Sequence, residues 1–340
     1  MALFKTTSDL KTFFPNIISD VLEQVLPFVD TAATQYIIPA LGEEEYNELD
    51  EAYNGEEELS ATQEELLPYV QKPLAYFAFQ YWFAHGQTQK STRGVSIMST
   101  DTSKTAWKWQ IDDERDACRM LGFLHLEKML KFLDANIDDY PTYGDSDAYD
   151  NNHEHFINFA DDFSKYYYIE NSRDTFETLR SVMREVEALY VRETIGADYY
   201  DELKGKILAD TLTEDDLLIL PDLKSAITRL TIATALLRLA VFINQYGIVQ
   251  RSRLSNYSEG GPELAPATEG QKGPLYDSLM NSGQTFLSKL ADYLNTNASD
   301  DHYATFKNSD VYKDPTADDA TRWDNTTPGN DGLAKRLFIA

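Results

Sequence analysis

The stretch Leu41-Gly42-Glu43-Glu44-Glu45-Tyr46-Asn47-Glu48-Leu49 reappears later in the chain as Ile195-Gly196-Ala197-Asp198-Tyr199-Tyr200-Asp201-Glu202-Leu203. A spacing of 153 or 154 residues also recurs on both sides of this stretch, at the pairs Tyr36/Tyr190, Pro68/Pro221 and Gly94/Gly247. A spacing that persists over such a length is typical of an internal duplication. The chain is therefore predicted to contain two copies of one structural unit.

A second match lies near the end of each unit. The residues Tyr140-Pro141-Thr142-Tyr143-Gly144-Asp145-Ser146-Asp147-Ala148-Tyr149 align without a gap on Tyr303-Ala304-Thr305-Phe306-Lys307-Asn308-Ser309-Asp310-Val311-Tyr312. The spacing rises to 161 at Leu133/Leu294, so the second unit carries a longer loop before this point. We predict repeat units at residues 1–155 and 156–312, joined around Asp150–Asp162, and a tail at residues 313–340 that repeats nothing.

Apolar residues recur at helical spacing in both units. They lie mostly three or four residues apart in predicted amphipathic helices at Ser19–Tyr36 and Ser172–Val191. Gly42 and Gly196 follow these segments, as expected just past a helix end where φ is positive. Short acidic helices are expected next, at about 43–53 and 197–207, because acidic residues favour the first turn of a helix.

A long helix follows in each unit. Ser60 with Gln63 and Thr213 with Asp216 resemble helix caps, and Pro68 and Pro221 are expected in first turns, where a missing N–H costs nothing. The runs at 74–83 and 227–237 are apolar on nearly every face, which predicts central, buried helices. A final helix is predicted at about 105–135 and again at 275–295.

The predicted fold class is therefore all-α, a tandem duplication of a four- to five-helix bundle with an extended C-terminal strap. Strands are expected to be minor and to lie at the polar loops, Thr92–Thr102 and Arg253–Gly273. The 340 residues suffice for two domains of ordinary size, and each unit has enough apolar residues for its own core.

The charge of the chain argues against a protein that binds nucleic acid without sequence specificity. The formal net charge is −27, from 57 acidic and 30 basic residues, with no basic cluster. Since sequence-independent nucleic-acid binding needs clustered cations, a DNA-gripping role is disfavoured; simple solubility is an equally good reason for the acidity.

Cys118 is the single cysteine and is expected to be small and buried. No signal peptide is indicated and no apolar run is long enough to span a bilayer, so a cytosolic origin is plausible.

No catalytic constellation stands out, and the chain is predicted to have no enzymatic activity and no cofactor. The motifs of phosphate-binding loops and of serine hydrolases are missing from the sequence. His153-Glu154-His155 is the one histidine cluster. Metal ligands on facing helices are three or four residues apart, whereas alternate positions in an Asp/Asn-rich linker indicate a solvated loop. No metal is predicted, although a helical enzyme with an acidic metal site remains a third hypothesis.

The repeated tyrosine-rich segment has two interpretations. It could form a contact surface, because tyrosine is enriched at protein interfaces, or a structural corner in which serine and aspartate hold a turn. The corner is favoured, and both hold if the corner touches a neighbouring subunit. The apolar tip of the tail is costly to leave in water, so docking on a partner is expected. Together the candidate interface residues are Tyr140, Tyr143, Tyr149, Tyr303, Phe306, Tyr312, Trp323, Leu337, Phe338 and Ile339.

The order of these features resembles a known family. An amphipathic helix, a Gly turn and Tyr-x-Glu-Leu precede a Leu-Pro pair, a long apolar helix and a polar loop. The loop leads to Trp107-Lys108-Trp109-Gln110-Ile111-Asp112-Asp113, of whose two tryptophans only one is expected to face inward, and then to Phe132-Leu133 and the tyrosine corner. Over residues 5–312 this is similar to a family of helical proteins encoded in Bacteroidetes phages and prophages, including crAss-like phages.

The resemblance implies a structural virion protein of the phage neck, made in the host cytoplasm. Such a head–tail connector would form a homo-oligomeric ring, with twelvefold symmetry as one candidate, between the portal protein and other neck or tail proteins. DNA would pass through an acidic lumen without specific binding, since few cations pair with phosphates there, and no membrane is involved. The family has no catalytic residues to carry over. The alternative is a soluble cytosolic helical binding or regulatory protein.

Overall fold

A computed structural model describes residues 3–315 except 16, 18–20, 57, 87, 93, 98–106, 210, 239–240, 245–246 and 251–267. Four candidate interface residues, Trp323, Leu337, Phe338 and Ile339, lie outside the described residues. Within these ranges the fold is all-α apart from two short hairpins, as the sequence predicted.

The first repeat begins with a short helix, continues through several shorter helices and a π-helical turn, and then contains two long helices. Its elements are α1 (Thr7–Lys11), α2 (Leu22–Ala32), a π-helical turn η1 (Ala33–Ile37), α3 (Ile38–Leu41), α4 (Glu43–Asn54), α5 (Ala61–His85), β1 (Thr88–Ser91), β2 (Gly94–Ile97), α6 (Lys108–Ala135), a 3₁₀ turn η2 (Ile137–Asp139), α7 (Pro141–Gly144) and α8 (Asp147–Asn152).

The second repeat returns nearly every element in the same order and at the predicted spacing. Its elements are α9 (Ala160–Tyr166), α10 (Arg173–Val186), a π-helical turn η3 (Glu187–Val191), α11 (Arg192–Ile195), α12 (Ala197–Leu208), α13 (Glu214–Arg238), β3 (Val241–Asn244), β4 (Gly247–Gln250), α14 (Glu269–Asn297) and α15 (Ala304–Lys307). The helices α5 and α13 start and end 153 residues apart, and α4 and α12 do so 154 apart. The predicted duplication is therefore present in the fold itself.

The long helices start at the predicted caps. The Ser60 hydroxyl accepts from the Gln63 N–H at 3.2 Å, and the Gln63 side chain accepts from the Ser60 N–H at 3.0 Å. Thr213 and Asp216 make the same reciprocal pair at 3.2 and 2.9 Å. Because these caps fix the helix starts, the prediction that Pro68 and Pro221 lie in first turns is wrong: both lie inside α5 and α13, two turns beyond the cap.

A π-helical turn interrupts the predicted amphipathic helix of each repeat. The helix predicted at Ser19–Tyr36 ends as α2 at Ala32 and continues through η1 into α3. The helix predicted at Ser172–Val191 breaks at the equivalent place, with α10, η3 and α11. Insertions of this kind are rare and are often found at functional sites. Their occurrence 154 residues apart is a further sign of common origin.

The strands are short, as predicted, but among them only β2 lies within a predicted polar loop; β1 precedes Thr92–Thr102, and β3 and β4 precede Arg253–Gly273. In each repeat an antiparallel hairpin extends the first long helix, with β1 paired to β2 and β3 paired to β4. The registers correspond residue by residue, because Thr88 faces Ile97 in the first hairpin and Val241 faces Gln250 in the second.

Each repeat has its own apolar core. One cluster of buried residues runs from Leu3 to Tyr143 and the other from Phe156 to Phe306, so the predicted division between residues 155 and 156 falls between them. Equivalent glycines let the long helices approach: a methyl group added at Gly122 would lie 2.6 Å from Phe77, and one at Gly283 would lie 2.6 Å from Leu230. These pairs fix α6 and α14 as counterparts with a spacing of 161.

The single cysteine lies in the first core. Cys118 is 2% exposed, and burial raises the pKa of its thiol to about 12. A thiol that stays protonated is a poor nucleophile. Cys118 therefore packs as a small apolar residue, as the sequence predicted.

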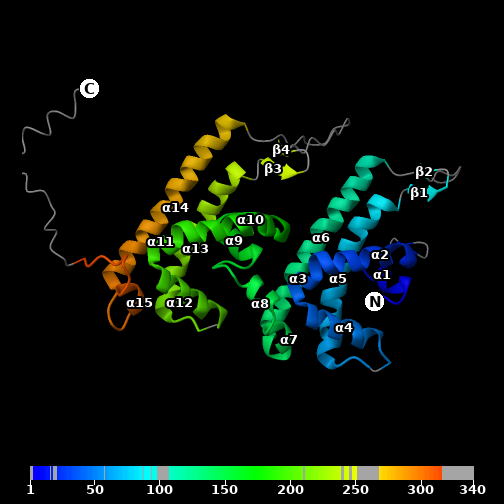
Figure 1. The fold of residues 1–340 in the computed structure, drawn as a ribbon, viewed down its shortest axis with the longest axis horizontal. Coiled ribbons are helices and arrows are strands. Elements are labelled where there is room, and N and C mark those ends of the chain that lie inside the picture. Colours follow the sequence, from blue (N-terminus) through cyan, green and yellow to red (C-terminus); the bar gives the residue numbers. More distant parts are fainter. Residues whose placement is uncertain are drawn as a thin grey trace, which may run out of the picture.

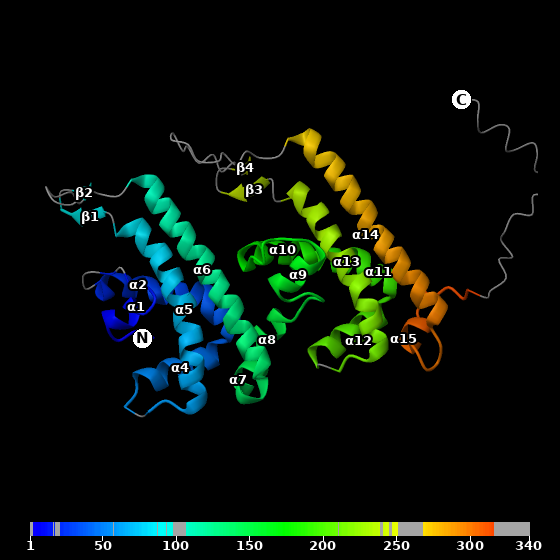
Figure 2. The same cartoon turned by 180° about the vertical axis from the view of Figure 1, so that it is seen from behind.

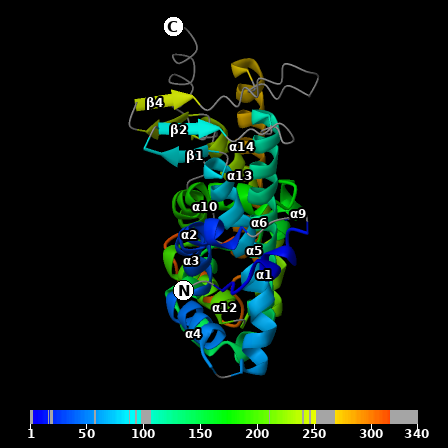
Figure 3. The ribbon, with the colours of Figure 1, turned by 90° about the vertical axis from the view of Figure 1, so that its right-hand side faces the viewer.

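The two repeats lie side by side along the long axis of the molecule (Figure 1, and from behind in Figure 2). Viewed down that axis they overlap: α2 with α10, the long helix pairs with each other, and the hairpins at one end (Figure 3). The copies are therefore displaced from each other mainly along this axis. Within the described residues, no helix is long and apolar enough to cross a membrane.

Candidate functional site: the junction between the repeats

The junction is the contact between α6 of the first repeat and the start of the second repeat, at α9 and the first turn of α10. Buried Glu127 of α6 accepts hydrogen bonds from the Ala160 N–H at 2.9 Å and from Arg173 Nη1 at 3.1 Å. Eight residues before Glu127 on α6, Arg119 pairs with Asp174 through two hydrogen bonds of 2.7 and 2.6 Å. Fork-to-fork pairs of this kind fix orientation as well as contact.

Further contacts extend the junction along α6. Lys131 lies 2.8 Å from Asp161 of α9 and 5.4 Å from the ring centre of Phe159. Phe159 precedes α9 yet packs against the core of the first repeat. The two repeats therefore touch through different surfaces, an α6 face on one side and an α9–α10 edge on the other.

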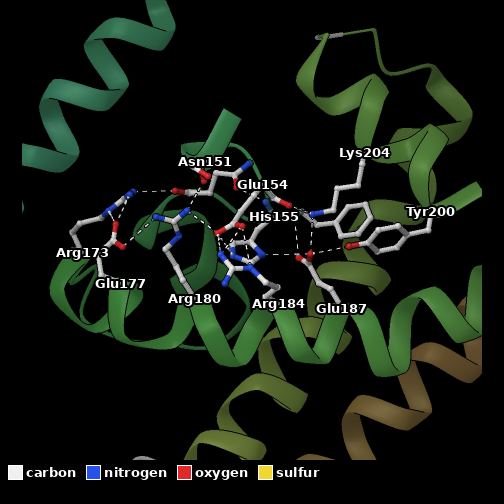
Figure 4. Close-up of polar contacts among 12 residues, drawn as sticks. Asn151, Glu154, His155, Arg173, Glu177, Arg180, Arg184, Glu187, Tyr200 and Lys204 are labelled. Atoms are coloured by element: carbon white, nitrogen blue, oxygen red, sulfur yellow. Dashed lines mark hydrogen bonds and ion pairs between the residues drawn. The ribbon is translucent and has the colours of Figure 1, made fainter. Parts of the chain in front are cut away.

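The segment that links the repeats is held by a second set of charges (Figure 4). Glu187 of η3 is 2% exposed and accepts from the Phe156 N–H at 3.0 Å, from Lys204 Nζ at 2.8 Å and from the Tyr200 hydroxyl at 3.2 Å. His155 Nδ1 lies 3.4 Å from Glu187. This Glu187 cluster fixes the linker to α10 and α12.

Glu154 adds a more exposed layer above this cluster. Its carboxylate accepts from Arg180 at 2.8 Å and from Arg184 at 2.6 Å, and its backbone oxygen accepts from Lys204. Contacts with charged side chains therefore hold the linker on both sides of His155 and fix its position against the second repeat.

Opposite charges decide the ionisation of these groups. Burial alone would raise the pKa of Glu187, but His155 and Lys204 outweigh it and hold that pKa below its usual range. Burial likewise opposes the effect of Arg184, His155 and Arg180 on Glu154, whose pKa is also lowered. For Lys204 burial prevails over Glu187 and lowers the pKa. The cluster is thus a compensated set of charges rather than an isolated buried one.

The histidines correct the prediction of a solvated loop. His155 is 1% exposed, and Nε2 of His153 lies 3.0 Å from Asp134 of α6. Their Asp/Asn-rich surroundings suggested solvent, but the fold buries them between helices α6, α10 and α12. In the described part of the chain no three potential metal ligands come together, and His155 has no surface from which it could reach a substrate.

The predicted corners are structural in both repeats. The Tyr140 hydroxyl donates to the Thr62 carbonyl at 3.0 Å, and the Tyr303 hydroxyl donates to the Asp215 carbonyl at 2.8 Å, so the two bonds close equivalent ends of the repeats. In each corner a serine hydroxyl donates to a backbone carbonyl at 2.6 Å, from Ser146 to Tyr143 and from Ser309 to Phe306.

Removing either tyrosine hydroxyl is expected to destabilise the chain modestly. Tyr140→Phe and Tyr303→Phe each remove one bond to a carbonyl and are expected to lower the free energy of unfolding by about 0.5–1.5 kcal/mol. Chemical denaturation monitored by circular dichroism measures this. Tyr168→Phe is the control, since Tyr168 is 72% exposed; a loss for Tyr140→Phe no larger than the loss for this control would contradict the structural role.

The corner residues differ in how much surface they offer to a partner. Tyr140, Tyr143, Tyr303 and Phe306 are buried within their own repeat, so their packing is internal. Tyr149 is half-buried and its hydroxyl reaches the Leu208 carbonyl of the second repeat at 3.5 Å. The counterpart Tyr312 is half-buried as well. Tyr149 is therefore a corner residue that also touches the other repeat of the same chain, and contact of the corners with a neighbouring subunit stays a prediction.

The two tryptophans before α6 correct another expectation. Trp107 is 72% exposed and Trp109 is 50% exposed, so neither faces inward. Trp107 is the cap residue of α6, which places both side chains at the open end of that helix, away from the core.

The junction and its linker were not predicted from the sequence, although a comparison of the two repeats contains a signal for the linker contacts. Glu187 and Ala33 stand 154 residues apart at the start of equivalent π-helical turns, and both are 2% exposed. A carboxylate at a position that is apolar in the other copy indicates a local partner that the other copy lacks. Lys204, whose counterpart is Asp50, is a second position at which the charge differs between the copies.

Comparison with known families agrees with the duplication. A family of unknown function, DUF6712, matches the chain at residues 37–153 and again at residues 191–316, together more than two thirds of its length. The chain belongs to this family. Each match covers most of one repeat, so the chain carries the family's unit twice. No curated protein and no solved structure shows a significant match.

Proposed function

We propose that this DUF6712 protein is a structural virion protein of a tailed phage, a connector that assembles into a ring in the neck between portal and tail. The observation that carries the proposal is the junction itself. Two copies of one unit associate through different surfaces, α6 on one and the α9–α10 edge on the other. Contacts of this heterologous kind generate rings or open filaments when they are repeated.

Two further features support a connector. The Glu187 cluster and the Arg119–Asp174 pair fix the orientation of the repeats, and a ring needs modules of fixed shape. The net charge of −27 favours a lumen that repels the phosphate backbone, so that DNA slides without adhering. The resemblance to helical proteins of Bacteroidetes phages supports the neck as the location of such a ring.

The test is the oligomeric state of the purified full-length chain together with its presence in particles. We expect negative-stain images to show rings, native mass spectrometry to give one closed stoichiometry, and proteomics of purified virions to detect the protein. A chain that stays monomeric, alone and with the portal protein of the same phage, and that is missing from virions would overturn the proposal and favour a cytosolic binding or regulatory protein.

A further inference from the structure

The second repeat has a groove on the side that faces away from the first. It lies between η3, α11 and α14 and has a volume of about 440 Å³. Its lining combines apolar side chains, among them Tyr190 and Leu287, with polar ones, and Leu189 in the lining is 57% exposed. At the position of Leu189 the first repeat carries Gln35.

The α6 part of the equivalent surface of the first repeat is covered by the second repeat, while Gln35 and Pro39, the counterparts of Leu189 and Glu193, stay exposed. Ser288, which lines the groove, corresponds to Glu127, and Glu127 binds the Ala160 N–H and Arg173. Thr194, which also lines the groove, corresponds to Ala40, whose carbonyl accepts from Asn152 of α8 within the first repeat itself at 2.8 Å, so the contact with the second repeat is made at Glu127. The groove is therefore the surface at which a third repeat would dock.

The opposite end of the molecule offers the matching edge. Helix α1 corresponds to α9, since their first residues, Thr7 and Ala160, are 153 apart. Both helices are held on their long helix by equivalent side chains: Gln71 of α5 donates to the Leu3 carbonyl at 2.6 Å, and Lys224 of α13 binds Asp162 at 2.6 Å. The α1 edge thus has the place in the first repeat that the docking edge has in the second.

The charges of the two ends are complementary. Glu193 and Asp292 are exposed at the groove, while Lys5 and Lys11 are exposed on either side of α1. Asp292 corresponds to Lys131, which pairs with Asp161 inside the chain. The counterpart of Asp161 is Ser8, so in a contact between copies Asp292 would face Ser8, which lies between Lys5 and Lys11 in the sequence.

From this geometry we propose that the groove on η3, α11 and α14 binds the α1 edge of a second copy of this chain, head to tail. The proposal rests on the proposed ring and names its lateral interface. The shift that superposes the repeats in Figure 3, applied once more, brings the next copy to the α14 side seen in Figure 1. Tyr312, the counterpart of Tyr149, then faces the end of α4 in that copy.

The first arm of the test uses one variant for each surface. Leu189→Asp places a charge in the groove, and Lys5→Glu with Lys11→Glu reverses the charge of the edge; all three side chains are exposed, so folding is expected to persist and is checked by circular dichroism. Each variant alone is expected to weaken self-association at least about tenfold in sedimentation. Leu218→Asp, at a 63% exposed leucine of α13 outside the groove, is the control and is expected to assemble like the wild type.

Mixing the variants separates head-to-tail docking from other arrangements. A groove variant and an edge variant each keep one intact surface, so an equimolar mixture is expected to form heterodimers and to stop there. A two-fold contact of groove on groove would give no heterodimer and would overturn the proposal. Rings that persist in Leu189→Asp would also overturn it while leaving the proposed function intact, whereas a monomeric wild type would remove the ring itself.

A covalent probe gives a second readout. Thr7→Cys and Ser288→Cys together place thiols at the counterparts of Ala160 and Glu127, which are in hydrogen-bond contact within the chain. Because Glu127 reaches Ala160 through its long side chain, a bismaleimide cross-linker replaces direct oxidation; it is expected to give a ladder of linked copies in denaturing gels, while the natural thiol of Cys118 is buried. Absence of the ladder from rings formed by this variant would contradict the assignment of the two surfaces.

Discussion

Replacing Glu187 by alanine is expected to lower the free energy of unfolding by about 3–5 kcal/mol. The loss is large because the substitution leaves Lys204 and His155 without the carboxylate between them and leaves the Phe156 N–H unpaired. Thermal and urea denaturation of the full-length chain measure it. Glu51→Gln, at an exposed position of α4, is the control and is expected to stay within about 0.5 kcal/mol of the wild type.

The pH dependence of stability distinguishes the effect of the charge of Glu187 from the effect of its packing. Because the pKa of Glu187 lies below its ordinary value of 4.5, its contribution is complete above pH 4.5 and is lost as the pH falls through the folded-state value. The stability difference between wild type and Glu187→Gln is therefore expected to shrink in acid. A difference that stays constant from pH 7 to pH 3 would show that Glu187 acts by shape alone.

Alanine at Gly196 is expected to destabilise the chain by about 1–3 kcal/mol or more. Gly196 has φ +81° and ψ 148°, a region that residues with a side chain rarely adopt. A methyl group there would also lie 3.0 Å from Cβ of Ser309 and 3.3 Å from Cγ2 of Val311. The turn between α11 and α12 and the corner after α15 would have to move apart.

A glycine in the next helix supplies the matched control. Gly205 lies inside α12, and a methyl group there meets nothing within 4 Å. Gly205→Ala is expected to raise stability by about 0.5–1 kcal/mol, because alanine loses less conformational freedom in a helix than glycine. Equal effects of the two substitutions in calorimetry would rule out the strain at Gly196.

The sequence predicts those parts of the fold that depend on local chemistry or on repetition. Helical spacing of apolar residues located the long helices, and reciprocal side-chain bonds at Ser60 and Thr213 located their starts. Glycines at positive φ were recognisable because both copies have one at the same point. The tyrosine corners were found through their repetition, and their serine-to-carbonyl bonds followed from the residue types.

Features that depend on tertiary contacts were missed. Pro68 appeared to mark a first turn, yet a long apolar helix tolerates it two turns inside because the packed core outweighs one lost hydrogen bond. His155 appeared solvated because its neighbours in sequence are polar, whereas it is 1% exposed and lies 3.4 Å from Glu187 of η3. The junction was missed for the same reason, since Glu127 and Arg173 are 46 residues apart.

The most direct measurement is an image reconstruction of the assembled full-length protein at a resolution that separates helices. We expect a closed ring in which each copy contributes two nearly identical helical repeats. The contact between copies would repeat the α6 contact with α9 and α10 seen within the chain, with α14 against α1. Isolated monomers, or dimers related by a two-fold axis across the α14 groove, would contradict it.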